Sequence, residues 1–251
     1  MLRLDEFPLS SKYDPEWVLA NEMGPNALWL TEALCQVMDL KPGKRVLDMG
    51  CGKAMSSIFL AKEFGAQVWA NDLWVSATDN GKRIREAGVE DRVFPIHAEA
   101  HSLPYADEFF DAIVSLDSYH YYGTDDLYLR YFMRFLKRGG QIGIVVPGLM
   151  REFNGEVPAH LTKRQPSGGR FWDPAECFSF HTLAWWLAHW ERTELVAIQR
   201  ADAIPDGWRH WLKFEQAKVA AGTNRHDDEV PALMADQGRY LGFVRMTATR
   251  K

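Results

Sequence analysis

The 251-residue chain has few cysteines, no long apolar run and no excess of basic residues. Its cysteines, Cys35, Cys51 and Cys177, form no CxxC pair. This argues against a disulfide framework and a cysteine zinc site, so we expect no metal and a reducing compartment. No window of about 18 apolar residues exists, so no membrane-spanning helix is expected. A net charge of −5 provides no overall basic face for phosphates, so we expect no nucleic-acid partner.

The chain also lacks targeting and repeat signals. Its first residues include Asp5 and Glu6 and no apolar stretch typical of a signal peptide, so we expect a cytoplasmic protein without a membrane partner. No internal repeat or low-complexity tract is present. What the chain has in quantity is apolar material. Hydrophobic residues make up 47% of the chain and aromatic residues 13%, which is enough for the core of one large domain.

Residues Val46 to Ala54, with the sequence VLDMGCGKA, predict a sharp turn between a strand and a helix. Gly50 and Gly52 have no Cβ, so they permit positive φ angles and let a ligand approach the main chain. An apolar strand that runs into an acidic residue and then into small residues is typical of a site for an adenosine-containing cofactor. An ordinary strand–turn–helix corner is the alternative, because glycines are common in turns.

A second apolar strand, Ala66 to Asp72, ends in a carboxylate 22 residues after Gly50. This spacing fits one βαβ unit in which Asp72 accepts hydrogen bonds from two ribose hydroxyls. A surface aspartate is the alternative. The two strands together predict a nucleoside site at one edge of a sheet.

The rest of the pattern predicts an α/β fold, a doubly wound sheet that is mostly parallel. Residues 1–40 are expected to form an N-terminal helical cap, and residues 41–251 the main domain. Residues 148–180 are expected to form an insertion or lid after the fifth strand, because glycines and prolines interrupt any regular pattern there. Beyond them, the pattern predicts helices at 182–190 and 208–221 and strands at 194–200 and 240–249.

Several motifs in a fixed order make the chain resemble a class I S-adenosylmethionine-dependent methyltransferase that acts on small molecules. Asp48 to Ala54 resembles the glycine-rich loop of this family, and Asp72 resembles its ribose acid. Residues 99–105 resemble the adenine-lining segment, 110–117 the fourth strand, and 136–146 the approach to the fifth. Two departures are that Ala54 stands where glycine is common and Glu99 where aspartate is more usual.

The resemblance implies S-adenosylmethionine as the cofactor and a Rossmann-like sheet whose last strand is antiparallel. It implies a cofactor site formed by Asp48, Gly50, Gly52, Asp72, Leu73, Glu99, Ala100 and Leu116. Tyr13, just ahead of the first cap helix, is expected to close over the cofactor, and a surface tyrosine is the alternative. The methyl group of Ala54 is expected to leave the turn intact while setting helix and strand slightly farther apart.

Catalytic candidates follow the fourth strand, because ligands of open α/β sheets bind outside the carboxyl ends of the strands. Methyl transfer mainly requires positioning, since the sulfonium carries its own leaving group. We expect His120 to act as a general base, because its ordinary pKa lies near neutrality, and Tyr119 to orient the acceptor. A histidine that only packs is the alternative. Tryptophans expected to border the acceptor, with core packing as the alternative, are Trp17, Trp29, Trp172, Trp208 and Trp211.

The sequence therefore predicts methyl transfer from S-adenosylmethionine to a nitrogen or oxygen of a small-molecule acceptor. Two alternatives stay open. One is a sensor or subunit that binds the cofactor without catalysis. The other is a nicotinamide-dependent dehydrogenase, although its fingerprint requires glycine where this chain has Met55. The sequence also leaves a homodimer open.

Overall fold

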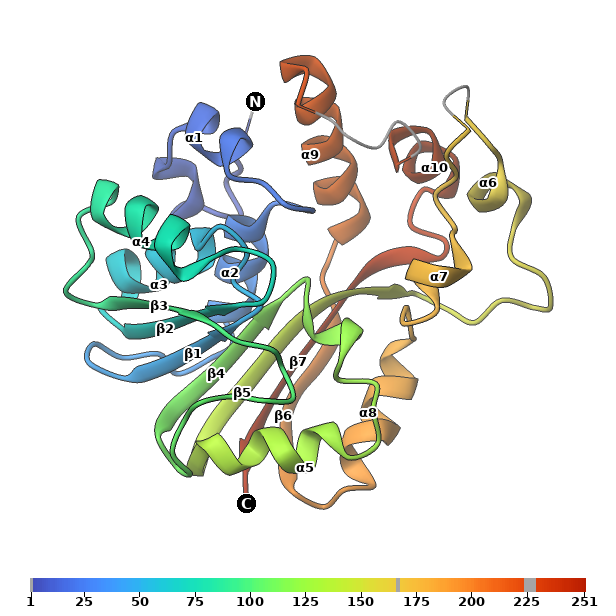
Figure 1. Cartoon of the computed structure of the whole chain (residues 1–251). Helices are drawn as coiled ribbons and strands as arrows, with labels where there is room; N and C mark the ends of the chain where they lie inside the picture. The colour runs from blue at the N-terminus through green and yellow to red at the C-terminus, as the bar shows by residue number, and fades with distance from the viewer. Residues whose placement is uncertain (1, 166–167, 224–228) are drawn as a thin grey trace.

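The computed structural model describes residues 2–165, 168–223 and 229–251. Within these residues, seven strands form one sheet in the order β3-β2-β1-β4-β5-β7-β6 (Figure 1). β7 runs antiparallel to both β5 and β6, and every other neighbouring pair is parallel. The strands are β1 Arg45–Met49, β2 Gln67–Asp72, β3 Val93–His97, β4 Phe110–Leu116, β5 Leu136–Leu149, β6 Val196–Ala203 and β7 Leu241–Arg250. The predicted doubly wound sheet with an antiparallel last strand is confirmed.

Helices cover both faces of the sheet. α2, α3 and α4 lie on one face and α5 and α8 on the other, while α6, α7, α9 and α10 gather beyond the carboxyl end of β5 (Figure 1). The described helices are α1 Pro15–Ala20, α2 Ala27–Cys35, α3 Met55–Phe64, α4 Ala77–Glu86, α5 Tyr128–Phe132, α6 Ala159–Thr162, α7 Pro174–Cys177, α8 Leu183–Glu191, α9 Gly207–Ala221 and α10 Glu229–Asp236. Short 3₁₀ turns are η1 Ser10–Lys12, η2 Tyr119–Tyr121 and η3 Met133–Phe135.

The core has two halves because successive strand residues point to opposite faces of the sheet. Val46 packs in the half beneath α2 and α3, and its neighbour Leu47 packs in the half beneath α5 and α8. Both side chains are fully buried. Strands covered on both faces need continuous apolar sequence, which is why β1 and β4 are recognisable without polar alternation.

The N-terminal helices pack directly on the sheet. A Cβ on Gly143 of β5 would lie 2.9 Å from Leu34 Cδ1 of α2, so the absent side chain lets helix and strand approach closely. Arg245 of β7 donates a hydrogen bond of 2.6 Å to the carbonyl of Ala33. The division at residue 40 therefore remains a prediction about sequence organisation, since α2 contributes to the common core.

The insertion region differs most from expectation. β5 continues to Leu149, and α6 and α7, of four residues each, lie within 148–180. Helices this short leave no periodic signal. α10 was not predicted, because its eight residues include Pro231 near the start. None of the helices in the described ranges is both long and apolar enough to span a bilayer.

Candidate active site

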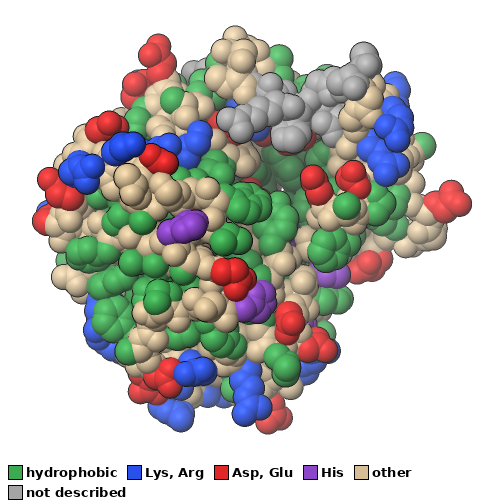
Figure 2. Space-filling model, in the orientation of Figure 1, with side chains coloured by type: hydrophobic (Ala, Val, Ile, Leu, Met, Phe, Trp, Pro, Cys, Tyr) green, Lys and Arg blue, Asp and Glu red, His purple; other side chains and the backbone are tan. Residues whose placement is uncertain are grey.

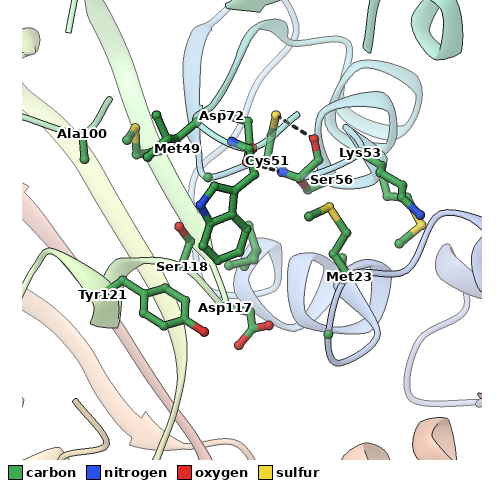
Figure 3. Close-up of a pocket in the computed structure, with 18 of the residues that line it drawn as sticks. Met23, Met49, Cys51, Lys53, Ser56, Asp72, Ala100, Asp117, Ser118 and Tyr121 are labelled. Carbon is green, nitrogen blue, oxygen red and sulfur yellow. Dashed lines mark hydrogen bonds between the residues drawn. The ribbon is translucent and has the colours of Figure 1, made fainter. Parts of the chain in front are cut away.

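A cavity of about 300 Å³ lies at the carboxyl ends of β1, β2 and β4, and we call it the first cavity. These three strand ends meet because the strands are parallel neighbours. Figure 3 shows Met23, Asp72, Ser118 and Tyr121 around the open space. The walls come from five stretches, within residues 21–27, 49–56, 72–74, 99–101 and 116–122.

The turn after β1 has the backbone that the glycines predict. Gly50 has a φ of 75° and Gly52 a φ of 54°. The N–H groups of Gly50 and Cys51 donate to the carbonyl of Asn71, at 2.9 and 3.0 Å. A Cβ on Gly50 would lie 1.9 Å from Ser118 Oγ, so only glycine fits at this point. The turn therefore leaves main chain bare beside the cavity.

Ala54, the third small position of this loop, also has a left-handed backbone, with a φ of 62°. It precedes the first residue of α3, and its side chain is fully buried. Alanine in this conformation is strained by roughly 1–2 kcal/mol, which glycine would avoid. Alanine in place of glycine at position 54 therefore strains the turn but does not change its path.

Asp72, at the end of β2, holds the neighbouring loops together. Its carboxylate accepts hydrogen bonds from the backbone N–H groups of Gly52 (2.8 Å), Trp74 (2.7 Å) and Val75 (2.8 Å). A carboxylate has about four acceptor positions, so room remains for a hydroxyl from the cavity. Asp72 thus fixes the shape of the site and still faces its interior (Figure 3).

Seven of the predicted cofactor residues line the first cavity, namely Gly50, Gly52, Asp72, Leu73, Glu99, Ala100 and Leu116. Glu99 is turned toward its own loop, where it accepts hydrogen bonds of 2.8 Å from the backbone N–H of His101 and pairs with His101 Nδ1. Partial burial raises the pKa of Glu99, but these hydrogen bonds outweigh burial and the pKa is lowered overall. Contact of these seven residues with the cofactor stays a prediction.

Asp48 does not line the cavity. It is fully buried beneath the turn, where Oδ2 accepts hydrogen bonds from Ser56 Oγ (2.5 Å) and Ser57 Oγ (2.6 Å) of α3. Burial raises the pKa of Asp48 to about 6, although the two serine hydrogen bonds oppose this shift. Its geometry is that of a support joining β1 to the start of α3.

Tyr13 also lies outside the first cavity. Its hydroxyl donates to Glu63 Oε1 at 3.3 Å, and its ring packs beside Trp17 and Phe59. The chain between α1 and α2 forms the wall instead, through Asn21 and residues 23–25. Its main chain is tied to the glycine turn, because Lys53 Nζ donates to the carbonyls of Ala20 and Glu22 at 3.1 and 3.3 Å.

A second cavity of about 470 Å³ adjoins the first, and the two share Met23, Gly24, Pro25, Asp117 and Tyr121 as lining residues. Its other walls come from the end of β5, residues 164 and 168–180, α9 and α10. Figure 2 shows the surface hollowed between the part that carries α3 and α4 and the part that carries α7 and α10. The second cavity therefore combines the α1–α2 connection and the strand ends with segments that follow β5 in sequence.

The two catalytic candidates lie in different places. His120 lines the second cavity, is 1% exposed, and its Nδ1 has no hydrogen-bond partner among the described residues. Burial lowers the pKa of His120 to about 3. Tyr119 is fully buried between Trp186, Trp190 and the rings of Tyr122 and α5, and it lines neither cavity. Its surroundings are those of a packing residue.

Sequence reasoning missed Asp117, which lies between the two cavities directly after β4. It has a φ of 52°, a conformation that aspartate adopts more readily than most residues. Burial, followed by the negative charge of Glu229, raises the pKa of Asp117 to about 8. The sequence contained a signal for Asp117, because it is an acid at the end of a buried strand, the same feature that singled out Asp72.

Of the tryptophans expected at the acceptor, Trp211 lines the second cavity.

The described residues contain no candidate metal site. In residues 2–165, 168–223 and 229–251, no group of three or more His, Cys, Asp or Glu side chains is arranged to hold an ion. Cys35, Cys51 and Cys177 are buried and form no disulfide among the described residues. Burial raises the pKa of the Cys51 thiol well above its ordinary value, so Cys51 remains a neutral packing group in the turn.

Sequence comparison identifies relatives across most of the chain. The profile of the family described as Methyltransferase domain matches residues 46–140. The chain is 32% identical to the 27-O-demethylrifamycin SV methyltransferase of Amycolatopsis mediterranei (strain S699), covering 88% of this chain and 82% of that protein. It is 35% identical to methyltransferase GfsG of Streptomyces halstedii over 46% of this chain, and the match spans less than half of GfsG, 42%.

Solved structures share the fold. The [4+2]-cyclase SpnF has a TM-score of 0.67 at 22% identity, over 92% of this chain and 83% of that chain. A geranyl diphosphate C-methyltransferase from Streptomyces coelicolor A3(2), solved with Mg²⁺, geranyl diphosphate and S-adenosyl-L-homocysteine, has a TM-score of 0.67 at 17% identity. That match covers 88% of this chain and 77% of the other. At these identities the likeness concerns the fold alone.

Proposed function

This chain belongs to the class I S-adenosylmethionine-dependent methyltransferases, and we propose that it methylates a nitrogen or oxygen of a small molecule held in the second cavity. Family membership sets aside the dehydrogenase and the non-catalytic sensor considered from the sequence. The observation that carries the proposal is the junction of the two cavities at Asp117 and Tyr121. A cavity of about 470 Å³ has the size of a site for one small molecule.

The residues that line the first cavity are suited to binding S-adenosylmethionine. Bare main chain at Gly50 and Gly52 gives close approach, and Asp72 offers a carboxylate to ribose hydroxyls. When bound, the cofactor supplies an electrophilic methyl group on a positively charged sulfur. The protein then has to hold the acceptor in line and keep water out. The chain at 23–25 serves both purposes, because it borders both cavities.

His120 contributes to this proposal as a hydrogen-bond acceptor for the N–H or O–H of the substrate. Because burial lowers its pKa to about 3, its ring is neutral at physiological pH and has a nitrogen lone pair available. The same lowered pKa makes His120 a weak general base. Tyr119 is left out of the proposal, because its side chain is enclosed in the core.

The named relatives support more than one acceptor atom. One of them is named as a methyltransferase of 27-O-demethylrifamycin SV. Phosphoethanolamine N-methyltransferase 1 of Arabidopsis thaliana is 31% identical over 45% of this chain and 23% of its own length. The sequence likeness to the N-methyltransferase covers only a small part of that protein. We therefore propose nitrogen or oxygen as the atom that accepts the methyl group. The assay decides whether carbon is methylated instead.

The test combines binding with turnover. Calorimetry with S-adenosylmethionine and S-adenosylhomocysteine is expected to give saturable binding, and a panel of amines and phenols is expected to give S-adenosylhomocysteine as product. His120→Phe keeps a ring beside Tyr121 and Phe180 and removes both nitrogens. We expect it to lower kcat/KM about tenfold or more while leaving cofactor affinity unchanged. Cofactor binding without turnover on any acceptor would refute the proposal.

We also propose a cytoplasmic location, supported by three cysteines that form no disulfide among the described residues, and a homodimer stays a prediction. Fractionation of the source cells and sedimentation of the purified protein test the two statements separately.

A further inference from the structure

We propose that the second cavity receives an acceptor that carries a positively charged amine, whose ammonium group lies against Asp117. This ammonium group serves recognition and is not the methylated atom, because a protonated nitrogen has no lone pair to attack the methyl group. This inference rests on the proposed function and names the chemical class of its substrate. Three features carry it: an acidic lining, a carboxyl group at the cavity junction without an ionic partner, and aromatic rings around the same space.

Acidic residues exceed basic ones in the second cavity. Among the described residues that line it, five are acidic, namely Glu22, Asp117, Asp173, Glu176 and Glu229, and three are basic, namely Arg164, Arg170 and Lys218. In Figure 2, acidic side chains stand on the rim of the hollow over α7. The surplus of negative charge favours a cationic ligand over an anionic one.

Lys218, the one lysine among the described lining residues, already pairs with two glutamates. Lys218 Nζ lies 2.6 Å from Glu215 Oε1 and 3.7 Å from Glu22 Oε2, and all three side chains are buried. Arg164 is exposed and donates to the carbonyl of Gly168 at 2.7 Å. Lys218 is thus shared between two carboxylates, and together with Arg164 and Arg170 it gives three basic residues against five acidic ones in the described lining.

Asp117 is the acid that most needs a partner. Its carboxyl group makes no hydrogen bond and no ion pair within the residues that the structure describes, although it borders both cavities (Figure 3). Burial and the nearby charge of Glu229 raise its pKa to about 8, and the opposing positive charge of Lys218 is too weak to offset them. An ammonium group supplies the missing charge and donates up to three hydrogen bonds.

Aromatic rings and an unpaired histidine point to the same ligand. Tyr121, Phe171, Phe180 and Trp211 line this cavity, and aromatic faces attract cations within about 6 Å. Trp211 Nε1 donates to Glu229 Oε2 at 2.9 Å, which fixes one carboxylate beside a ring. His120 Nδ1, buried in the same lining, has no partner among the described residues and accepts a hydrogen bond from an ammonium N–H.

The experiment measures binding of two probes of the same shape to the protein loaded with S-adenosylhomocysteine. The probes are 2-phenylethylamine, a cation at pH 7, and neutral 2-phenylethanol. We expect the amine to bind about tenfold or more tightly, as one charge-assisted contact allows. We expect Asp117→Asn and Glu229→Gln each to reduce this preference to about threefold or less. Asp91→Asn, an exposed surface change outside both cavities, serves as the matched control and should leave the preference intact.

Each outcome decides the question. Equal affinity for the two probes, no saturable binding of the amine, or a preference that survives in both variants would overturn the inference. The affinity for S-adenosylhomocysteine, measured first in every variant, reports that the protein is folded. If wild type binds this cofactor product and methylates phenols but shows no amine preference, the amine inference fails and the proposed function stands. If wild type does not bind it, the proposed function fails.

Discussion

The two cavities are built in different ways. Most of the first cavity comes from short stretches that each follow a parallel strand, and its key groups are main chain at Gly50 and Gly52 and one carboxylate. The second cavity takes its walls from the α1–α2 connection, the end of β5, residues 164 and 168–180, and the helices α9 and α10. Cofactor binding thus depends on local turn geometry, whereas acceptor binding depends on segments brought together only by the complete fold.

The largest effect is expected at the turn, where Gly50→Ala adds a methyl group 1.9 Å from Ser118 Oγ at a positive φ. The left-handed backbone and the clash together should cost about 3 kcal/mol of unfolding free energy and weaken cofactor binding. Gly43→Ala is the matched control, because Gly43 has a φ of 80° with nothing within 4 Å. Urea denaturation that gives the same loss for both variants would show that the clash has no role.

Asp72→Ala should lower the affinity for S-adenosylhomocysteine by about 2–3 kcal/mol, measured by calorimetry. The change removes the proposed ribose acceptor and also frees the N–H groups of Gly52, Trp74 and Val75. Asp79→Ala, on the exposed side of α4, is the control. Unchanged affinity in Asp72→Ala would contradict the assignment of the first cavity to the cofactor.

The second cavity should respond to pH through Asp117. Its pKa is raised to about 8, so the folded protein binds the proton more tightly than the unfolded chain. Stability supplied by the protonated carboxyl is therefore complete below about pH 4 and is lost as the pH rises toward 8. Asp117→Asn removes this loss. Relative to wild type, the variant should gain about 2–4 °C in Tm between pH 5 and pH 8, or roughly 1 kcal/mol.

The comparison between variants isolates Asp117 from its charged neighbours. Glu22, Glu229 and Lys218 share the cavity with it, and Glu215, whose pKa burial raises to about 8, lies behind Lys218. All four are present in both proteins. If thermal unfolding followed the same pH curve in wild type and variant, Asp117 would be an ordinary solvated acid.

The smallest effect is expected for Ala54→Gly. Glycine relieves the left-handed strain at this position, but it also increases the entropy of the unfolded chain, so a net gain of about 0.5 kcal/mol remains. Chemical denaturation of the two proteins side by side measures it. A clear loss of stability would mean that the alanine methyl group packs well enough to outweigh the strain.

The sequence was sufficient for the first cavity because βαβ geometry fixes where its residues meet. Gly50, Gly52 and Asp72 lie on neighbouring strand ends, and their spacing along the chain sets their spacing in space. Leu73, Glu99, Ala100 and Leu116 followed from the family resemblance and also line the cavity. Asp48 has the family position but lies beneath the turn, since its depth depends on how α3 packs.

Most of the residues that line the second cavity could not be predicted from the sequence. Asp117 and Glu229 are separated by most of the second half of the chain, and no local pattern relates them. Tyr13 was expected to close over the cofactor, but residues 23–25 line the first cavity instead. Their position depends on the α1–α2 connection, where the carbonyls of Ala20 and Glu22 accept hydrogen bonds from Lys53 of the glycine turn. His120 was found from its place after β4, while the burial that lowers its pKa comes from the tertiary fold.

The claim that the cofactor binds in the first cavity and the acceptor in the second is tested most directly by a crystal structure. The crystal should contain the protein with S-adenosylhomocysteine and 2-phenylethylamine together. The two-cavity account predicts the nucleoside in the first cavity with ribose hydroxyls at Asp72, and the amine in the second cavity against Asp117. A nucleoside bound in the second cavity, or at another edge of the sheet, would contradict it.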